Sequence, residues 1–162
     1  MTKSKKIVLF DIDNTLFNTL RFKSTNFEIF SIYEDVIETL TDLATIADLG
    51  IFSEGDLAFQ KQKLLETNIE NYFLKEHMHI VPEKIAAIEA LVKKYKSQND
   101  AQVFLIDDKL PILPVIKKHF PSIFTIWIKR GEHAPSQAPI EGFTPDAEIV
   151  SLQEAVPLIK NK

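Results

Sequence analysis

Hydrophobic and polar positions alternate along this chain in two kinds of block. Short, almost wholly apolar runs predict six β-strands, at 6–11, 46–53, 77–81, 102–107, 124–129 and 147–150. Between them, apolar residues recur every three or four positions, which predicts helices at 33–43, 57–67, 83–96, 111–119 and 152–160. In the 83–96 stretch, Ile88, Leu91 and Tyr95 share one helical face while Lys93 points elsewhere.

Apolar strands that alternate with amphipathic helices are typical of a parallel sheet covered on both faces. We therefore expect an α/β three-layer sandwich with a Rossmannoid parallel sheet. The length of 162 residues suits a single domain, which we expect to span 1–162. Such folds bind ligands at the carboxyl ends of the strands, so polar residues at strand ends are the first candidates for function.

Composition removes several classes of function. Apolar residues make up 45% and charged residues 26%, which indicates a folded protein rather than a disordered one. The four glycines, at 50, 55, 131 and 142, have no spacing that could form a G-x-G-x-x-G dinucleotide site. The absence of cysteine excludes disulfides, thiolate catalysis and thiolate metal sites, and it is compatible with a reducing compartment.

Charge and hydropathy indicate which partners and which cellular location to expect. A net charge of −4 lacks the basic footprint of a protein that follows a nucleic-acid backbone, so a nucleic-acid partner is not expected. The strongest apolar stretch, 123–128, is far shorter than the roughly 20 residues that span a bilayer. The apolar run at 7–10 meets Asp11 too soon for a signal peptide, so we expect a cytoplasmic protein without a membrane span.

Carboxylates stand where apolar strands end. Asp11 and Asp13 close the first strand, and Asp107 and Asp108 close the fourth. Burying unpaired carboxylates is unfavourable, and a hard cation such as Mg²⁺ would offset that penalty with one or two carboxylates, water and substrate phosphate. Taken singly, each residue also has an ordinary structural explanation, as a helix cap or a turn residue.

The run VLFDIDNTL at 8–16 resembles the first motif of the haloacid dehalogenase (HAD) superfamily, a hydrophobic strand followed by D-x-D-x-T. Three further segments resemble the later motifs in the family's order: LGIFSEG at 49–55 with Ser53, VPEKI at 81–85 with Lys84, and FLIDD at 104–108. The similarity extends from residue 6 to about residue 159. Two positions depart from the family pattern, Glu54, where Asn is commoner, and Ile112, where a further acid is usual.

This resemblance implies a Mg²⁺-dependent phosphomonoester hydrolase. The first Asp would be the nucleophile that forms an aspartyl-phosphate, and the second would act as general acid and then base. A D-x-D sequence favours phosphatases over dehalogenases, which generally lack it. The resemblance implies catalytic roles for Asp11, Asp13, Ser53 and Lys84, substrate binding by Thr15, Ser53, Glu54 and Lys84, and metal binding by Asp11, Asp13 (through its backbone carbonyl), Asp107 and Asp108.

The motif spacing leaves no room for a cap domain of the kind that many family members insert. Asp11 and Ser53 are 42 positions apart, and Ser53 and Lys84 are 31 apart, and predicted helices and strands occupy most of both intervals. We expect a capless member whose open site is shielded either by a large substrate or by a second copy of the chain. The segment 19–31 would form a flap or contact surface, unless Phe22, Phe27 and Phe30 pack on the chain's own sheet.

A second hypothesis is a HAD-fold binding or regulatory protein with weak or lost catalysis, motivated by Glu54 and Ile112. The intact Asp11, Asp13, Ser53 and Lys84 set favours the enzyme. No His spacing indicates a metal site, and Arg130 and His133 are expected in a solvated loop, although both could border the pocket.

Overall fold

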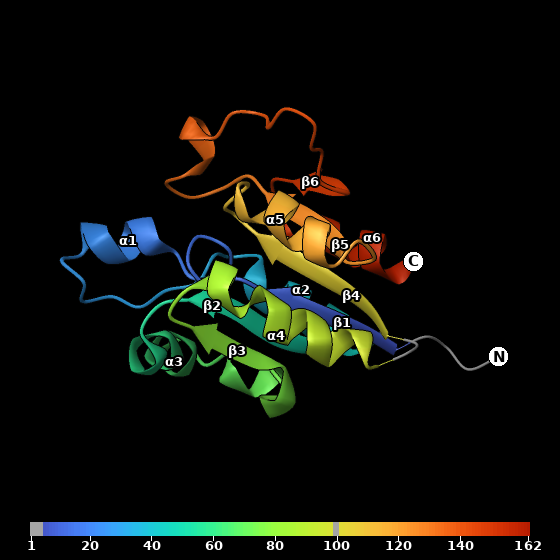
Figure 1. Cartoon of the computed structure of the whole chain (residues 1–162). Coiled ribbons are helices and arrows are strands. Elements are labelled where there is room, and N and C mark those ends of the chain that lie inside the picture. The colour runs from blue at the N-terminus through green and yellow to red at the C-terminus, as the bar shows by residue number, and fades with distance from the viewer. Residues whose placement is uncertain (1–4, 99–100) are drawn as a thin grey trace.

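The computed structural model describes residues 5–98 and 101–162 (Figure 1). Its six strands are β1 (Lys5–Phe10), β2 (Asp48–Glu54), β3 (Met78–Val81), β4 (Ala101–Asp107), β5 (Phe124–Ile128) and β6 (Ala147–Ile149). They form one sheet in the order β3-β2-β1-β4-β5-β6, and every neighbouring pair is parallel. Each strand lies within two residues of its predicted bounds, which confirms the parallel sheet.

The helices are α1 (Thr19–Ser24), α2 (Val36–Ala44), α3 (Leu57–Glu66), α4 (Lys84–Lys96), α5 (Ile112–His119) and α6 (Ala155–Lys160). Four 3₁₀ turns accompany them, η1 (Glu70–Tyr72), η2 (Lys75–His77), η3 (Ala134–Ser136) and η4 (Leu152–Glu154). The pattern did not predict α1, because this short helix buries only Phe22 and so has no apolar periodicity. Within the described ranges, no helix combines the length and the apolar character that crossing a membrane requires.

Both faces of the sheet are covered, as the apolar strands predicted. In β1, Ile7 and Leu9 point into one core, which α4 and α5 complete, while Val8 and Phe10 point into the other, with residues of α2 and α6. Figure 1 shows α4 and α5 in front of the sheet and α2 and α6 behind it. The three-layer sandwich is therefore confirmed.

The chain changes direction across the sheet between β1 and β4. It runs outward from β1 through β2 to β3 and then crosses to β4, which pairs with the other side of β1. Phe10 lies opposite Ile106, and the backbone N–H of Asp11 donates to the Ile106 carbonyl over 2.9 Å. The carboxyl ends of β1 and β4 thus meet at the switch point where such sheets bind ligands.

The segment that follows β1 leaves the body of the protein and returns to it. Short bridges join Phe17 to Asp13 and to Ile32, and between these ends α1 projects from the body (Figure 1). The described residues between β1 and β2 hold only α1 and α2, and those between β2 and α4 hold α3, two 3₁₀ turns and β3. Neither interval forms a separate cap domain.

Gly50 in β2 supplies a test of how tightly β2 packs. A Cβ on Gly50 would lie 2.5 Å from both the Cβ and the carbonyl oxygen of His77. We predict that Gly50→Ala lowers the free energy of unfolding by about 3 kcal/mol, because backbone has to move. Gly142→Ala, where only the left-handed backbone (φ 75°) is unfavourable, should lose about 1 kcal/mol. Urea denaturation checks both, and an equal loss in the two variants would contradict the packing argument.

Candidate active site

A buried lysine links the ends of β1 and β4. Lys84, the first residue of α4, places its Nζ 2.7 Å from Asp11 Oδ1 and 2.6 Å from Asp107 Oδ2. Burial alone would lower the pKa of Lys84, but the charges of Asp107 and Asp11 outweigh it and raise the pKa. Lys84 is therefore a fixed cation between two strand ends.

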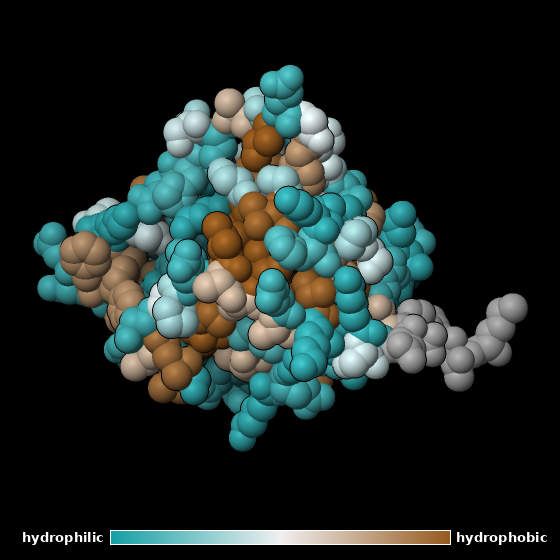
Figure 2. Space-filling view, viewed as in Figure 1, coloured by the Kyte–Doolittle hydropathy of each residue, from teal (hydrophilic) through white to brown (hydrophobic). Residues whose placement is uncertain are grey.

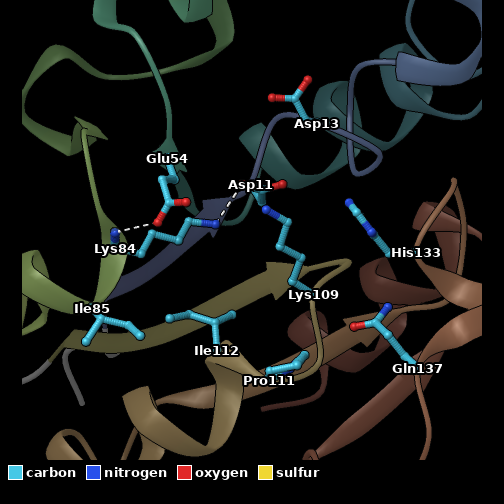
Figure 3. A pocket seen from close by; sticks show the side chains of 10 residues that line it. All are labelled: Asp11, Asp13, Glu54, Lys84, Ile85, Lys109, Pro111, Ile112, His133 and Gln137. Carbon is cyan, nitrogen blue, oxygen red and sulfur yellow. Dashed lines mark hydrogen bonds and ion pairs between the residues drawn. The ribbon is translucent and has the colours of Figure 1, made fainter.

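Glu54 holds the start of α4 in place. Its Oε2 accepts a hydrogen bond of 2.9 Å from the backbone N–H of Lys84, one of the donors that a helix N-terminus leaves unpaired (Figure 3). The carboxylate also lies favourably near the positive end of the helix dipole. The residue that departs from the family pattern thus anchors the residue that carries the cation.

Three carboxylates converge beside Lys84. Ligand oxygens of Asp11, Asp107 and Asp108 lie within 4.8 Å of one another, and all three residues are buried. Burial, together with the charge of Asp107, raises the pKa of Asp11 to about 6 despite Lys84. Burial followed by the charges of Asp11 and Asp107 raises the pKa of Asp108 to about 9.

Asp108 is the member of this group that most needs a cation. Neither of its carboxylate oxygens has a hydrogen-bond partner among the described residues. The backbone is held firmly, because Trp127 Nε1 and Gln137 Nε2 donate to the Asp108 carbonyl over 3.0 and 2.8 Å. Buried carboxylate oxygens without donors, close to two further carboxylates, suit a hard divalent cation. The three aspartates can hold a metal ion.

The Asp13 carboxylate is held by side chains of α1 and α3 rather than by Lys84. Its Oδ1 accepts from Lys63 Nζ at 2.7 Å and from Thr19 Oγ1 at 3.1 Å, and its Oδ2 accepts from Gln60 Nε2 at 2.9 Å. The next residue, Asn14, has the left-handed backbone (φ 59°) that Asn tolerates and that turns the chain after the strand. Sequence reasoning missed Gln60 and Lys63, although they are three positions apart and so share one face of the predicted helix.

Ser53 and Thr15 are both fully buried. Ser53 Oγ accepts a hydrogen bond of 2.8 Å from Gln60 Nε2, and its own proton is left to donate. Thr15 Oγ1 has no partner among the described residues, while the Thr15 carbonyl accepts from Arg130. The roles predicted for both hydroxyls stay predictions.

A cavity of about 400 Å³ opens beside Asp11, Asp13 and Lys84. Figure 3 shows Glu54 and Lys84 on one side of Asp11, the Lys109 side chain reaching toward Asp11 from another side, and Asp13 and His133 farther along the wall. Ile85, Pro111, Ile112 and Gln137 complete the lining. Ile112 therefore contributes apolar wall at the position where an acid is usual. The cavity combines a carboxylate cluster with cations around it, which suits an anionic substrate.

Arg130, at the start of the loop that follows β5, is not solvated as we expected, since its side chain is 10% exposed. Arg130 Nη1 lies 2.8 Å from both oxygens of Asp35, and its guanidinium stacks over the Tyr33 ring at 4.0 Å. Because Arg130 also bonds to the Thr15 carbonyl, it ties the turn after β1 to the start of α2. His133 does border the cavity, which was the alternative that the sequence left open.

The carboxylate cluster predicts a specific response to Mg²⁺. At about 100 times its Kd, Mg²⁺ should stabilise the wild-type protein by about 2.7 kcal/mol, and Asp108→Asn should lose most of this gain. In the metal-free protein at pH 7 the same variant should be no less stable than wild type, because the raised pKa of Asp108 keeps the buried carboxyl mostly neutral and the variant replaces it with a neutral amide. Thermal unfolding with Mg²⁺ or a chelator, with the exposed Asp42→Asn as control, measures both effects. An undiminished Mg²⁺ response in Asp108→Asn would contradict the assignment.

Comparison with known proteins identifies solved structures of similar fold. No family model matches the chain, and no curated protein matches it. A candidate haloacid dehalogenase-like hydrolase from Burkholderia xenovorans superposes with a TM-score of 0.74 at 18% identity, covering 98% of both chains. A candidate phosphatase from Clostridium difficile gives 0.72 at 15% identity, covering 98% of this chain and 100% of its own. An L-2-haloacid dehalogenase gives 0.70 at 13% identity with the same coverage.

Identities this low bear on the fold alone, and the matched proteins include both candidate phosphatases and a dehalogenase. They cover nearly the whole of this chain, so the shared fold extends over the whole sheet. The chain therefore has the α/β fold of the haloacid dehalogenase-like hydrolases.

Proposed function

We propose that the protein is a Mg²⁺-dependent phosphomonoester hydrolase that works through an aspartyl-phosphate on Asp11. The observation that carries the proposal is the position of this carboxylate. It is buried at the end of β1, lines the cavity, and has Lys84 on one oxygen and the carboxylates of Asp107 and Asp108 beside it. A nucleophile that carries phosphate needs such a cationic partner and a metal position close by.

The reaction would proceed in two displacements. In the first, an Asp11 oxygen attacks phosphorus, the bond between phosphorus and the leaving oxygen breaks, and Asp13 gives its proton to the departing alcohol. In the second, Asp13 takes a proton from water, which attacks phosphorus, breaks the bond to Asp11 and releases phosphate. A Mg²⁺ ion held by Asp11, Asp107, Asp108 and the Asp13 carbonyl would neutralise charge on the phosphoryl oxygens.

The surrounding residues would hold the phosphoryl group. Lys84 supports the proposal as a fixed positive charge beside the nucleophile, and Ser53 has a hydroxyl proton to donate. Thr15 and Glu54 would also contribute to substrate binding, and Glu54 would do so through the backbone of Lys84. Asp13 favours phosphate esters over C–halogen bonds, because an alcohol leaving group needs a proton and a halide does not.

The structure weakens the case for a purely regulatory protein. That hypothesis depended on the unusual residues Glu54 and Ile112. Glu54, however, accepts a hydrogen bond from the backbone N–H of Lys84 and so supports the residue that would bind phosphate. Ile112 removes a carboxylate, yet three others still converge. No observation on the described residues favours lost catalysis over the enzyme.

Replacing the nucleophile tests the proposal. Wild type with Mg²⁺ should release phosphate from p-nitrophenyl phosphate or from members of a phosphometabolite and phosphopeptide panel. Asp11→Asn should lower turnover by at least about 10³-fold, because an amide cannot form the acyl phosphate. The exposed Asp42→Asn, which keeps the site intact, should leave turnover unchanged.

Beryllium fluoride provides a second readout, since it mimics a phosphoryl group on a carboxylate. We expect wild type to bind it in the presence of Mg²⁺ and Asp11→Asn not to. A folded, Mg²⁺-loaded protein that neither binds beryllium fluoride nor hydrolyses any ester would favour the binding-protein hypothesis. Full activity in Asp11→Asn would exclude this nucleophile.

Because the site has no cap domain, a partner or a large substrate would have to shield it from water. Phe22 and Phe30 pack on the chain itself, against Phe17 and against Phe59 of α3, whereas Phe27 is 63% exposed. Figure 2 shows hydrophobic residues on the projecting segment around α1, at the left of the view. Other exposed apolar residues of the same region are Leu20, Ile29 and Phe59.

If the substrate is small, we predict that a second copy of the chain covers this face and shields the site from water. Light scattering over a concentration series should then show self-association, and Phe27→Ser should weaken it. If the substrate is a macromolecule, the chain should stay monomeric and prefer macromolecular phosphoesters. A strict monomer that hydrolyses a small metabolite efficiently would contradict the shielding argument.

A further inference from the structure

We infer that Lys63 and Gln60 of α3 are positioning residues that hold the carboxylate of Asp13 for proton transfer to the leaving group. This inference rests on the proposed function, because it assigns Asp13 the role of acid and base. It concerns a helix that contributes no residue to the four motifs. Three observations support it: the burial of both side chains, their contacts with Asp13, and the local structure that places them.

Lys63 is a buried lysine whose carboxylate partner is Asp13. Its side chain is 7% exposed, and its Nζ lies 2.7 Å from Asp13 Oδ1. The ammonium group also lies over the rings of Phe59 and Phe17, 4.5 and 5.2 Å from their centroids. A buried ammonium is unfavourable unless it is paired, so the fold retains this lysine at a position where an apolar side chain would pack more simply. The two rings restrict where the ammonium can move.

Gln60 connects the same carboxylate to the rest of the site. Its Nε2 lies 2.9 Å from Asp13 Oδ2, 2.8 Å from Ser53 Oγ and 3.3 Å from the Glu54 carbonyl. An amide nitrogen has two hydrogens, so these three acceptors share two donors. Because one group contacts both Asp13 and Ser53, it sets the position of the general acid relative to a phosphoryl-binding hydroxyl.

The start of α3 is built to present these two side chains. Asp56 caps the helix by accepting a 2.8 Å hydrogen bond from the backbone N–H of Phe59. Gly55, with φ 147°, leaves room for Gln60, because a Cβ there would lie 3.1 Å from Gln60 Cγ. From that start, residues 60 and 63 fall on the same inward face.

The consequence is that both oxygens of Asp13 are fixed by donors on the side of α3 and α1. Thr19 adds the third contact, to Oδ1 over 3.1 Å. Asp13 itself is part of the cavity wall. A general acid is effective only when its proton meets the leaving oxygen, and a displacement of about 1 Å can lower the rate about 10²-fold. Removing Lys63 or Gln60 should therefore impair proton transfer without removing the nucleophile, the metal position or the cavity.

The test compares two leaving groups. An alkyl phosphate needs a proton from Asp13 to expel its alcohol, whereas p-nitrophenolate leaves without one. In Lys63→Met, kcat/KM for the alkyl ester should fall by about 10- to 100-fold relative to wild type, while kcat/KM for p-nitrophenyl phosphate should change by less than about threefold. Gln60→Leu should likewise lower the ratio of kcat/KM for the alkyl ester to kcat/KM for p-nitrophenyl phosphate. Lys61→Met, on the exposed face of α3, is the matched control and should leave the ratio unchanged.

The outcomes separate this inference from the proposed function. If the variant keeps the wild-type fold by circular dichroism and the ratio falls, the positioning role is supported. If both esters lose kcat/KM equally, or neither changes, Lys63 is a structural residue and the inference is overturned while the phosphatase stands. If wild-type protein with Mg²⁺ hydrolyses neither ester and does not bind beryllium fluoride, the proposed function fails and the inference fails with it.

Discussion

The bridge that Lys84 makes between Asp11 and Asp107 is the interaction on which the site depends. Its two carboxylates lie at the ends of adjacent central strands, and all three groups are buried. Removing one partner of a buried ion pair typically costs about 3–5 kcal/mol, because the remaining charge stays desolvated. Asp108 adds a third carboxylate, which Lys84 does not contact and whose two oxygens have no hydrogen-bond partner among the described residues. That unpartnered carboxylate beside two others is the physical reason to expect a metal ion.

The order of the strands creates this arrangement. Since β1 pairs with β2 on one side and β4 on the other, the residues after Phe10 and Ile106 become neighbours although almost 100 positions separate them. The chain then brings α4 back so that its first residue reaches both strand ends, with Glu54 at the end of β2 holding its N-terminus. Four separate segments thus meet at one edge of the sheet.

The sequence predicted the strands well, and the structure brings Asp11, Lys84 and the Asp107–Asp108 pair together at the strand ends. Both results have a physical reason. Buried parallel strands need continuous apolar runs, and a carboxylate at the end of such a run is conspicuous. The same reasoning missed Lys63 and Gln60, because a lone Lys or Gln in an amphipathic helix resembles ordinary surface residues. Arg130 was placed in a solvated loop for a similar reason, since its partner Asp35 lies 95 positions away and only the tertiary structure brings the two together. Long-range polar contacts of this kind leave no local periodicity to detect.

The central claim is that Asp11 carries the phosphoryl group during turnover, and trapping that group is its most direct test. The protein would be mixed with Mg²⁺ and a phosphate monoester, quenched in acid during turnover, and treated with borohydride, which reduces an acyl phosphate to the corresponding alcohol and releases phosphate. Mass spectrometry of the peptides should then find the reduced side chain at position 11. An unmodified Asp11 in protein quenched during active turnover, or a reduced carboxylate at Asp13, Asp107 or Asp108 instead, would contradict the account.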